Sequence, residues 1–366
     1  ENGVVAKEMV MQEGHLEGHF REYYEDGTLR MEAQYRKGKL HGPVNAYYRN
    51  GKPERVMNYQ DDKRWGNYEQ YDDSGRIVLR CTYRDGKEEG EEYWYEKGVE
   101  HGKIVYKKGV PVSYRFTDAS GKVSGASDGP VNVLVTYYLN GNKNTEAPYR
   151  NQSVEGEVRY YYPTGQLKEK ASFAQGERSG KSVSYDKLGA ISVEAHYEKG
   201  ELHGSYKSFF PNGKVQAEGT FIEGTREGLW KYYYSNGKLK QESFFVDGDM
   251  NGSSKYYNPD GTPDYTDIYD LGLLNGVIQY DTNGKAWRKE YYPPGKAVYR
   301  LLYDYSTVTL LEVEMKNGLL DGFSRRYFPD GKLEEQGYFR LGRRDSLLVA
   351  YHYSGGERVN GMYRDG

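Results

Sequence analysis

Histidines, acidic pairs and a single cysteine are the side chains of this chain that could support catalysis or bind a metal. His41, His101 and His203 each stand directly before a glycine. A metal or catalytic site needs a unique cluster of groups, whereas these histidines occupy one turn position several times. Cys81 likewise occupies a position that holds alanine in other copies of the same pattern. We therefore expect no metal, no cofactor and no catalytic residue, and predict that the protein is not an enzyme.

Pairs of adjacent aromatic residues, such as Tyr23-Tyr24 and Tyr233-Tyr234, are more informative. Neighbouring residues on a strand point to opposite faces, so one ring of each pair would enter the core and the other would lie opposite. If the opposite face is open, it forms an aromatic stripe suited to peptide or glycan stacking. If the sheet curls and covers both rings, or if the tyrosines merely protect the sheet, the stripe has no binding role. The candidate binding residues of the stripe are Tyr24, Tyr48, Tyr162, Phe210, Tyr234 and Phe328.

The composition narrows the range of partners. The chain has 51 Lys and Arg against 54 Asp and Glu, a formal net charge of −3. Basic residues are thus matched by acidic ones, and we expect no nucleic-acid partner. No run approaches the roughly 18 apolar residues of a membrane span, so no transmembrane segment is predicted. The chain begins at Glu1 rather than Met, which suggests removal of an upstream segment; a secretory signal would explain this and favours the cell envelope over the cytoplasm.

The histidines, Cys81 and the aromatic pairs named above belong to a repeat with a period of 24 residues. The pattern G-x-x-x-x-[YF]-x-x-x-G-x-[LIV]-x-x-x-x-x-[FY]-x-x-G-x-x-x-G starts at Gly156, Gly180, Gly204 and Gly228, and the last copy ends at Gly252. A fixed period in this range is the signature of an array of supersecondary units. Places within a repeat are numbered below from its opening glycine, which is place zero.

Each repeat is predicted to form two strands. Asn-Gly or Asp-Gly recurs at places eight and nine, as in Asn236-Gly237, and marks a hairpin because both residues tolerate positive φ. Leu239 and Phe245 then alternate with charged residues, as expected of a strand. Place fifteen is small, which predicts close approach of a ring or backbone from a neighbouring repeat. The expected fold class is all-β: an elongated, twisted antiparallel β-meander of tandem β-hairpins, with the fifth- and seventeenth-place rings stacked in ladders.

The whole chain, residues 1–366, reads as a single repeat array of about fifteen units. Two stretches depart from the pattern, near 103–131 and near 285–317. In the first, residues 119–130 read as a loop or insertion, and simple sequence drift is favoured. The second contains Trp287, Tyr292 and the pair Pro293-Pro294. There we favour a functional or oligomer-forming feature, with Trp287 and Tyr292 as candidate binding residues.

The segments Tyr35–Gly42, Tyr197–Gly204 and Phe245–Gly252 resemble MORN repeats. More narrowly, they are similar to the 24-residue bacterial variant that is grouped with the YwqK-type "antitoxin" proteins. The resemblance covers almost the whole chain and is weakest over 103–131 and 285–317. It implies a curved or twisted strip of β-hairpins without shared catalytic residues. It also implies a role as a scaffold or binding module, through lipid, protein or self-association.

Two functions follow from these observations. The leading hypothesis is a non-catalytic MORN-like scaffold that mediates protein–protein interaction with an unidentified protein partner. The alternative is a glycan- or lipid-binding surface module of the cell envelope, which would use the exposed aromatic stripe. A signal peptide before Glu1 would exclude a cytosolic antitoxin role.

Overall fold

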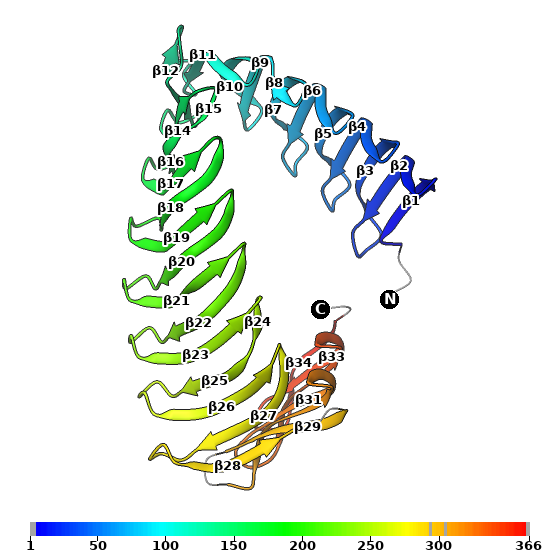
Figure 1. The fold of residues 1–366 in the computed structure, drawn as a ribbon, viewed down its shortest axis with the longest axis vertical. Coiled ribbons are helices and arrows are strands. Elements are labelled where there is room, and N and C mark those ends of the chain that lie inside the picture. The colour runs from blue at the N-terminus through cyan, green and yellow to red at the C-terminus, as the bar shows by residue number, and fades with distance from the viewer. Residues whose placement is uncertain (1–4, 293–294, 304–305, 364–366) are drawn as a thin grey trace. The chain divides into compact units, whose positions relative to one another are not determined.

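The computed structural model describes residues 5–292, 295–303 and 306–363. The secondary structure of these ranges consists of β-strands, which pair antiparallel with their neighbours in the chain. This confirms the predicted all-β meander of tandem hairpins (Figure 1). The chain divides into two compact units, residues 1–180 with 187–189 (unit 1) and residues 181–186 with 190–366 (unit 2). Pro293 and Pro294 lie outside the described residues.

Unit 1 contains a first sheet, β1 to β12, and the beginning of a second, β13 to β17, with the strands in chain order. The short strands β8 and β15 pair beside β7 and β14. The strands are β1 (Lys7–Gln12), β2 (His15–Tyr23), β3 (Leu29–Arg36), β4 (Lys39–Tyr47), β5 (Pro53–Gln60), β6 (Lys63–Tyr71), β7 (Ile77–Arg84), β8 (Lys87–Glu88), β9 (Gly90–Glu96), β10 (Val99–Lys107), β11 (Val110–Thr117), β12 (Val123–Ser127), β13 (Val133–Tyr137), β14 (Lys143–Arg150), β15 (Ser153–Val154), β16 (Gly156–Tyr161) and β17 (Leu167–Ala174). The division between the units falls within β18 (Glu177–Tyr185).

Unit 2 contains a run of strands from β19 to β28 and a further sheet from β29 to β34, again in chain order. The strands are β19 (Ile191–Glu198), β20 (Glu201–Phe209), β21 (Val215–Ile222), β22 (Thr225–Tyr233), β23 (Leu239–Val246), β24 (Asp249–Met250), β25 (Gly252–Tyr257), β26 (Pro263–Asp270), β27 (Leu273–Tyr280), β28 (Ala286–Tyr291), β29 (Lys296–Leu302), β30 (Thr309–Lys316), β31 (Leu319–Tyr327), β32 (Leu333–Arg340), β33 (Arg343–Tyr351) and β34 (Glu357–Tyr363). In Figure 1 the last sheet, orange to red, lies beside the yellow strands β27 and β28, and the Leu274 amide donates to the carbonyl of Gly318 at 3.2 Å.

The repeats are joined by two-residue turns with both residues in the left-handed region. Asp247 and Gly248 have φ of 50° and 89°, as in the type I′ turns whose twist matches that of the flanking strands. Gly248 also donates its amide hydrogen to the carbonyl of Arg226 in the preceding repeat at 3.0 Å. These turns therefore stack on one another from repeat to repeat.

The turns at places eight and nine are built differently from the prediction. At Asn236-Gly237 only the glycine has a positive φ, 91°, and its amide donates to the Tyr234 carbonyl at 2.8 Å. The asparagine contributes its side chain instead: Oδ1 accepts from the Lys238 amide at 2.9 Å, and Nδ2 donates to the carbonyl of Pro259 in the next repeat at 2.9 Å. The pair marked the hairpin correctly, but the predicted tolerance of positive φ is used by the glycine alone.

The core lies at places two, four, thirteen, fifteen and seventeen. Trp230, at place two, is 1% exposed, and its indole covers Gly219, where a Cβ would come within 2.3 Å of the ring. Gly219 is place fifteen of the preceding repeat, so the predicted reason for a small residue there is confirmed. Phe245 at place seventeen is also buried and meets Trp230 edge-on, with ring centroids 6.4 Å apart.

The predicted ladder of fifth- and seventeenth-place rings is wrong. Tyr233, at place five, is three residues from buried Trp230 and therefore points to the other face. There its hydroxyl donates to Glu218 Oε1 of the preceding repeat at 2.6 Å. The same bond from a fifth-place tyrosine to the glutamate fifteen residues earlier recurs along the array. Its members are Tyr23–Glu8, Tyr47–Glu32, Tyr161–Glu146, Tyr233–Glu218 and Tyr257–Glu242.

The order of strand pairing breaks twice, and each break falls in one of the two irregular stretches. In unit 1 the break lies between β12 and β13, and in unit 2 between β28 and β29. The predicted loop at 119–130 is partly wrong, because β12 occupies 123–127 and pairs with β11. Two hydrophobic clusters lie at these breaks, one around Phe116 in unit 1 and one around Tyr299 in unit 2. We call these regions junction 1 (β9–β14) and junction 2 (β26–β31).

Candidate functional site

The six residues of the predicted aromatic stripe are all half-buried: Tyr24, Tyr48, Tyr162, Phe210, Tyr234 and Phe328. Tyr24 donates its hydroxyl to the carbonyl of Tyr47 at 2.8 Å, and Tyr234 donates to the carbonyl of Tyr257 at 2.7 Å. Both acceptors lie one repeat ahead, so these hydroxyls fasten consecutive repeats. Basic side chains also lie over the rings, with Arg49 at 5.3 Å from the Tyr24 centroid. The stripe therefore has clear structural contacts, and binding through it stays a prediction.

Tyr292 and Trp287, the candidates of the second irregular stretch, occupy different environments. Tyr292 packs edge-on against Tyr299, with ring centroids 5.9 Å apart, and its hydroxyl donates to Glu290 Oε2 at 3.1 Å. Trp287 lies half-buried on β28, and its Nε1 is buried without a hydrogen-bond partner in the part of the chain that the structure describes. Tyr292 thus belongs to the core of junction 2.

A buried carboxyl lies at the centre of junction 2. Asp267 is 6% exposed and occupies place fifteen, which is small in the regular repeats. It accepts a hydrogen bond from the Tyr299 hydroxyl at 3.0 Å, and burial raises the pKa of its carboxyl to about 7. Burial also raises the pKa of Tyr299, Tyr265 and Tyr269 around it. The group can hold a proton near neutral pH, but it faces tyrosines in a closed core rather than an open site.

Gln279 replaces backbone pairing at the same junction. Its Nε2 donates to the Leu302 carbonyl at 2.9 Å, and its Oε1 accepts from the Leu302 amide at 3.1 Å. The side-chain amide thereby makes the two hydrogen bonds that a neighbouring strand would make. Arg288 completes the arrangement by donating to Gln279 Oε1 at 2.8 Å and to the carbonyl of Arg300.

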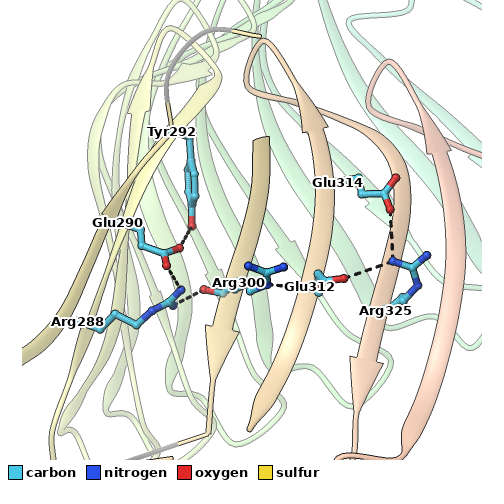
Figure 2. A network of polar contacts seen from close by, with 7 residues as sticks. All are labelled: Arg288, Glu290, Tyr292, Arg300, Glu312, Glu314 and Arg325. Atoms are coloured by element: carbon cyan, nitrogen blue, oxygen red, sulfur yellow. Dashed lines mark hydrogen bonds and ion pairs between the residues drawn. The ribbon is translucent and has the colours of Figure 1, made fainter. Parts of the chain in front are cut away.

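Figure 2 shows how charged residues extend this contact across the last sheet. Arg300 Nε donates to Glu312 Oε2 at 2.8 Å, and Arg325 Nη1 lies 3.3 Å from both Glu312 and Glu314. Positive and negative groups alternate through the network, so each charge is partnered. This is the pattern of a structural lock rather than of a site that awaits a charged ligand.

Junction 1 is less completely filled. The ring of Phe116 is fully buried, and the rings of Trp94, His101 and Tyr137 surround it with centroids 5.9 to 6.1 Å away. Beside it lies an open cavity of about 360 Å³, lined by Trp94, Tyr95, Tyr137, Asn144 and their neighbours. A second hollow of about 770 Å³ lies against Val110, Pro111, Val131 and Tyr149. The second hollow is lined by residues of the first irregular stretch, for which sequence drift is the favoured explanation, and the first is lined by residues on either side of that stretch.

Exposed leucines form a row on the two-residue turns of unit 2 and at the strand starts that directly follow such turns. Leu271, Leu273, Leu319 and Leu341 are 58%, 39%, 38% and 66% exposed, and we call them the leucine edge. A Cβ on Gly318 would lie 2.7 Å from Leu273 Cβ, and one on Gly342 would lie 4.0 Å from Leu319 Cδ2. The turns that carry them are therefore adjacent. The corresponding places in the regular repeats hold mainly charged residues: Lys37, Lys39, Asp85, Lys87, Lys199, Glu201, Asp247 and Asp249.

Sequence reasoning missed both the leucine edge and the cavity. The available signal was a departure from the rule of the repeat rather than a motif. Leucine replaces a charged residue at place nineteen in Leu271 and Leu341. At the cavity, Lys122 replaces the glutamate expected fifteen residues before the fifth-place Tyr137.

The residues first considered for chemistry lie apart from one another. His41 Nδ1 lies 3.2 Å from Asp61 Oδ1, and His203 Nε2 lies 3.6 Å from Glu198. Cys81 fills a buried place-fifteen position, and burial raises the pKa of its thiol to about 12. Within the described ranges, no three His, Cys, Asp or Glu side chains gather closely enough to hold a metal ion.

Residues 125–129 read G-A-S-D-G, which places Ser127 at the spacing of a nucleophile elbow. That motif needs a helix directly after the serine. Ser127 instead ends β12, and its Oγ donates to the Gly129 carbonyl at 3.4 Å.

Over the residues that the structure describes, none forms a helix long and apolar enough to cross a membrane.

Six segments of the chain match the family model of the MORN repeat variant, which confirms the predicted repeat type for these segments. They are residues 16–37, 40–61, 154–175, 202–223, 226–247 and 320–340. MORN repeats are a non-enzymatic repeat family, generally found in scaffolds for protein or membrane interaction. The match does not distinguish the bacterial YwqK-type subfamily. No curated protein sequence matches the chain.

Solved structures show only weak likeness. A crystal structure of TcdB2-TccC3 without its hypervariable C-terminal region is 10% identical with a TM-score of 0.16, over 99% of this chain and 28% of that one. The TcdB2-TccC3-Cdc42 structure is 9% identical with a TM-score of 0.15, over 99% and 28%. A eukaryotic initiation factor is 11% identical with a TM-score of 0.25, over 97% of both chains. This chain thus spans 28% of the first of these proteins, and TM-scores this low carry no argument.

Proposed function

We propose that this protein is a non-catalytic scaffold of MORN-type repeats that binds a protein partner through the leucine edge of unit 2. The observation that carries the proposal concerns backbone conformation. Sixteen non-glycine residues in the described ranges have φ in the left-handed region; fourteen are polar, and the two apolar ones are Leu271 and Leu341. A bulky apolar residue is disfavoured in that region.

These two leucines are also poorly buried within the chain. Both are more than half exposed, at 58% and 66%, so the strained turns present apolar side chains to the surroundings. Strained positions cluster at functional surfaces, and adjacent exposed apolar residues are typical of interaction sites. The leucine edge therefore has the character of a surface that a partner covers.

The charges around the leucine edge favour a protein over a membrane surface. Asp321 Oδ1 accepts from the Leu341 amide at 3.3 Å, and the Asp249 carboxylate lies beside Gly272. An anionic membrane attracts clusters of basic residues, whereas carboxylates line this edge together with Arg343. A protein partner with an apolar strip and mixed charges matches that surface.

The double variant L271N/L341N tests the proposal in the full chain. Asparagine tolerates the left-handed region, so the turns should form at least as well as in the wild type. Cross-linking and affinity capture from a lysate of the source organism, read by quantitative mass spectrometry, should show proteins captured by the wild type and lost with the variant. Liposome flotation and light scattering measure membrane binding and self-association in parallel.

The matched control is Leu188→Asn, which changes a leucine that is 87% exposed on a turn outside the leucine edge. It should capture the same proteins as the wild type. Identical capture by L271N/L341N and the wild type would refute the proposal. Flotation of the wild type with liposomes, abolished in the double variant, would replace the protein partner with a membrane.

A further inference from the structure

The 360 Å³ cavity of junction 1 is lined by groups that elsewhere in the array are engaged within the fold. In regular repeats the fifth-place tyrosine donates its hydroxyl to a glutamate fifteen residues earlier, as Tyr233 does to Glu218 at 2.6 Å. The residue fifteen before Tyr137 is Lys122. Tyr137 instead packs over Gly125, where a Cβ would lie 2.4 Å from both its ring and its hydroxyl oxygen. Among the described residues, no hydrogen-bond partner is found for its hydroxyl.

Asn144 is the second unused polar group on the cavity wall. It is half-buried, and its side-chain amide makes no hydrogen bond to any other described residue. An amide carries two donor hydrogens and an acceptor oxygen. Together with the phenol of Tyr137, it offers paired donors and acceptors beside aromatic surface.

Aromatic rings make up much of the remaining wall. Trp94, Tyr95 and Tyr138 line the cavity together with Tyr137. The hydroxyl of Tyr138 is engaged with the Tyr161 carbonyl at 2.9 Å, and that of Tyr95 with Glu100 at 3.1 Å. These two residues therefore contribute ring surface rather than free hydroxyls to a ligand.

The wall carries no cation and a single carboxylate. Neither lysine nor arginine is among the lining residues. Its carboxylate, Glu96, accepts from the Leu139 amide at 2.9 Å. His101 is buried, and burial lowers the pKa of its imidazole, so the ring is neutral at pH 7. An anionic ligand would find no cation here, whereas the carboxylate of Glu96 can accept further hydrogen bonds from ligand hydroxyls.

We propose that this cavity binds a neutral carbohydrate, with one sugar ring stacked on the aromatic wall and its hydroxyls paired with Tyr137 and Asn144. A sugar ring has an apolar face that stacks on aromatic rings and an edge of hydroxyls that both donate and accept. A purely apolar ligand would leave the phenol and the amide desolvated without partners. The volume lies within the range of small-ligand sites, about 300–1,000 Å³. The proposal goes beyond scaffolding and does not depend on the leucine edge.

The test begins with the labelled full chain on an array of neutral glycans, followed by titration of maltose, cellobiose and N,N′-diacetylchitobiose by saturation-transfer NMR and calorimetry. At least one of these sugars should bind. Asn144→Ala should weaken binding at least tenfold, and Tyr137→Phe about fivefold, because each removes a hydrogen bond to the sugar. Neither change should alter thermal stability, since neither group bonds within the described fold.

Tyr233→Phe is the matched control, because it deletes a fifth-place hydroxyl that is engaged with Glu218. It should leave sugar affinity unchanged while lowering stability, the reverse of Tyr137→Phe. No binding on the array and in all three titrations would overturn the proposal. Sugar binding that Asn144→Ala and Tyr137→Phe both leave intact would overturn it equally, because the ligand would then lie elsewhere.

Discussion

Junction 1 and junction 2 interrupt the same repeat in different ways. At junction 1 the fully buried ring of Phe116 packs among Trp94, His101 and Tyr137, and hollows of about 360 and 770 Å³ remain beside it. At junction 2 a polar lock replaces strand pairing: the Gln279 amide mimics a strand toward Leu302, and Asp267 accepts from Tyr299 at 3.0 Å. Both junctions have an apolar cluster, and junction 2 adds directed hydrogen bonds that take the place of strand pairing.

The difference follows from the geometry of the forces. Hydrophobic contact has no direction and is satisfied by any close approach, so junction 1 can hold together while leaving space at its edge. A buried polar group must find a partner at a defined distance and angle. Junction 2 therefore fixes its parts closely, and junction 1 is the better place for a ligand.

Phe116→Ala should break the comparison most strongly. Removing a fully buried ring costs about 3–5 kcal/mol of folding free energy, from lost transfer and the cavity left behind. In a repeat array each unit contacts mainly its neighbours, so the loss should stay local. Hydrogen–deuterium exchange should accelerate in β10–β14 and stay unchanged in β26–β31. Equal acceleration at both junctions would contradict the expectation that Phe116 stabilises junction 1 and not junction 2.

Asp267→Asn should change how the free energy of unfolding depends on pH, because it removes the buried carboxyl of junction 2. The pKa of Asp267 is about 7 in the fold against about 3.9 unfolded. Between these values the folded state binds the extra proton, so its contribution falls as pH rises from 4 to 7. The full difference is up to about 4 kcal/mol. Urea titrations at pH 4.5, 6 and 8 should show that slope in the wild type and a shallower one in the variant.

Glu92 provides the comparison at junction 1. It is 6% exposed, accepts from Trp94 Nε1 at 2.7 Å, and burial raises its pKa to about 7. Glu92→Gln should remove a similar part of the pH slope, but the change should be seen in exchange of β7–β10. If Asp267→Asn leaves the slope unaltered, its carboxyl does not titrate in this range.

Gln279→Ala should loosen junction 2 by about 2 kcal/mol, because it leaves the Leu302 amide and carbonyl without their partners. Exchange of the Leu302 amide should rise, and Arg288 should lose one of its acceptors. The measurement is exchange by NMR or mass spectrometry over β27–β30. Unchanged protection of Leu302 would show that the side-chain amide does not replace a strand there.

Tyr233→Phe should have the smallest effect, about 1 kcal/mol, because it deletes one hydrogen bond between repeats. Tyr137→Phe makes the same chemical change at junction 1, where no such bond is found, and should leave the unfolding midpoint unchanged. The two variants each remove one hydroxyl oxygen, one in a regular repeat and the other at a junction, so their stabilities can be compared directly. Equal midpoints for both variants would show that the fifth-place bond contributes nothing.

Much of this architecture could be predicted from the sequence because local physics repeats. Asn236-Gly237 marked a hairpin, and the small residue at place fifteen announced the ring that covers it, as Trp230 covers Gly219. The predicted ring ladder is wrong at Tyr233. The face to which a strand residue points is assigned by counting from a residue known to be buried, and the sequence pattern does not identify place two as a core position. Trp287 and Tyr292 drew attention to junction 2, whose charged groups the structure shows to be partnered.

What the sequence alone determined is the repeat: its period, its two strands, its turns and its strand type all follow from backbone preferences and side-chain alternation within 24 residues. The way in which the repeat is interrupted depends on the tertiary structure. The approach of Gln279 to Leu302, the burial of Asp267, and the space beside Tyr137 and Asn144 depend on residues far apart in the chain. The repeat pattern predicts nothing where the period fails, because the contacts there are made by packing between sheets rather than by neighbours in sequence.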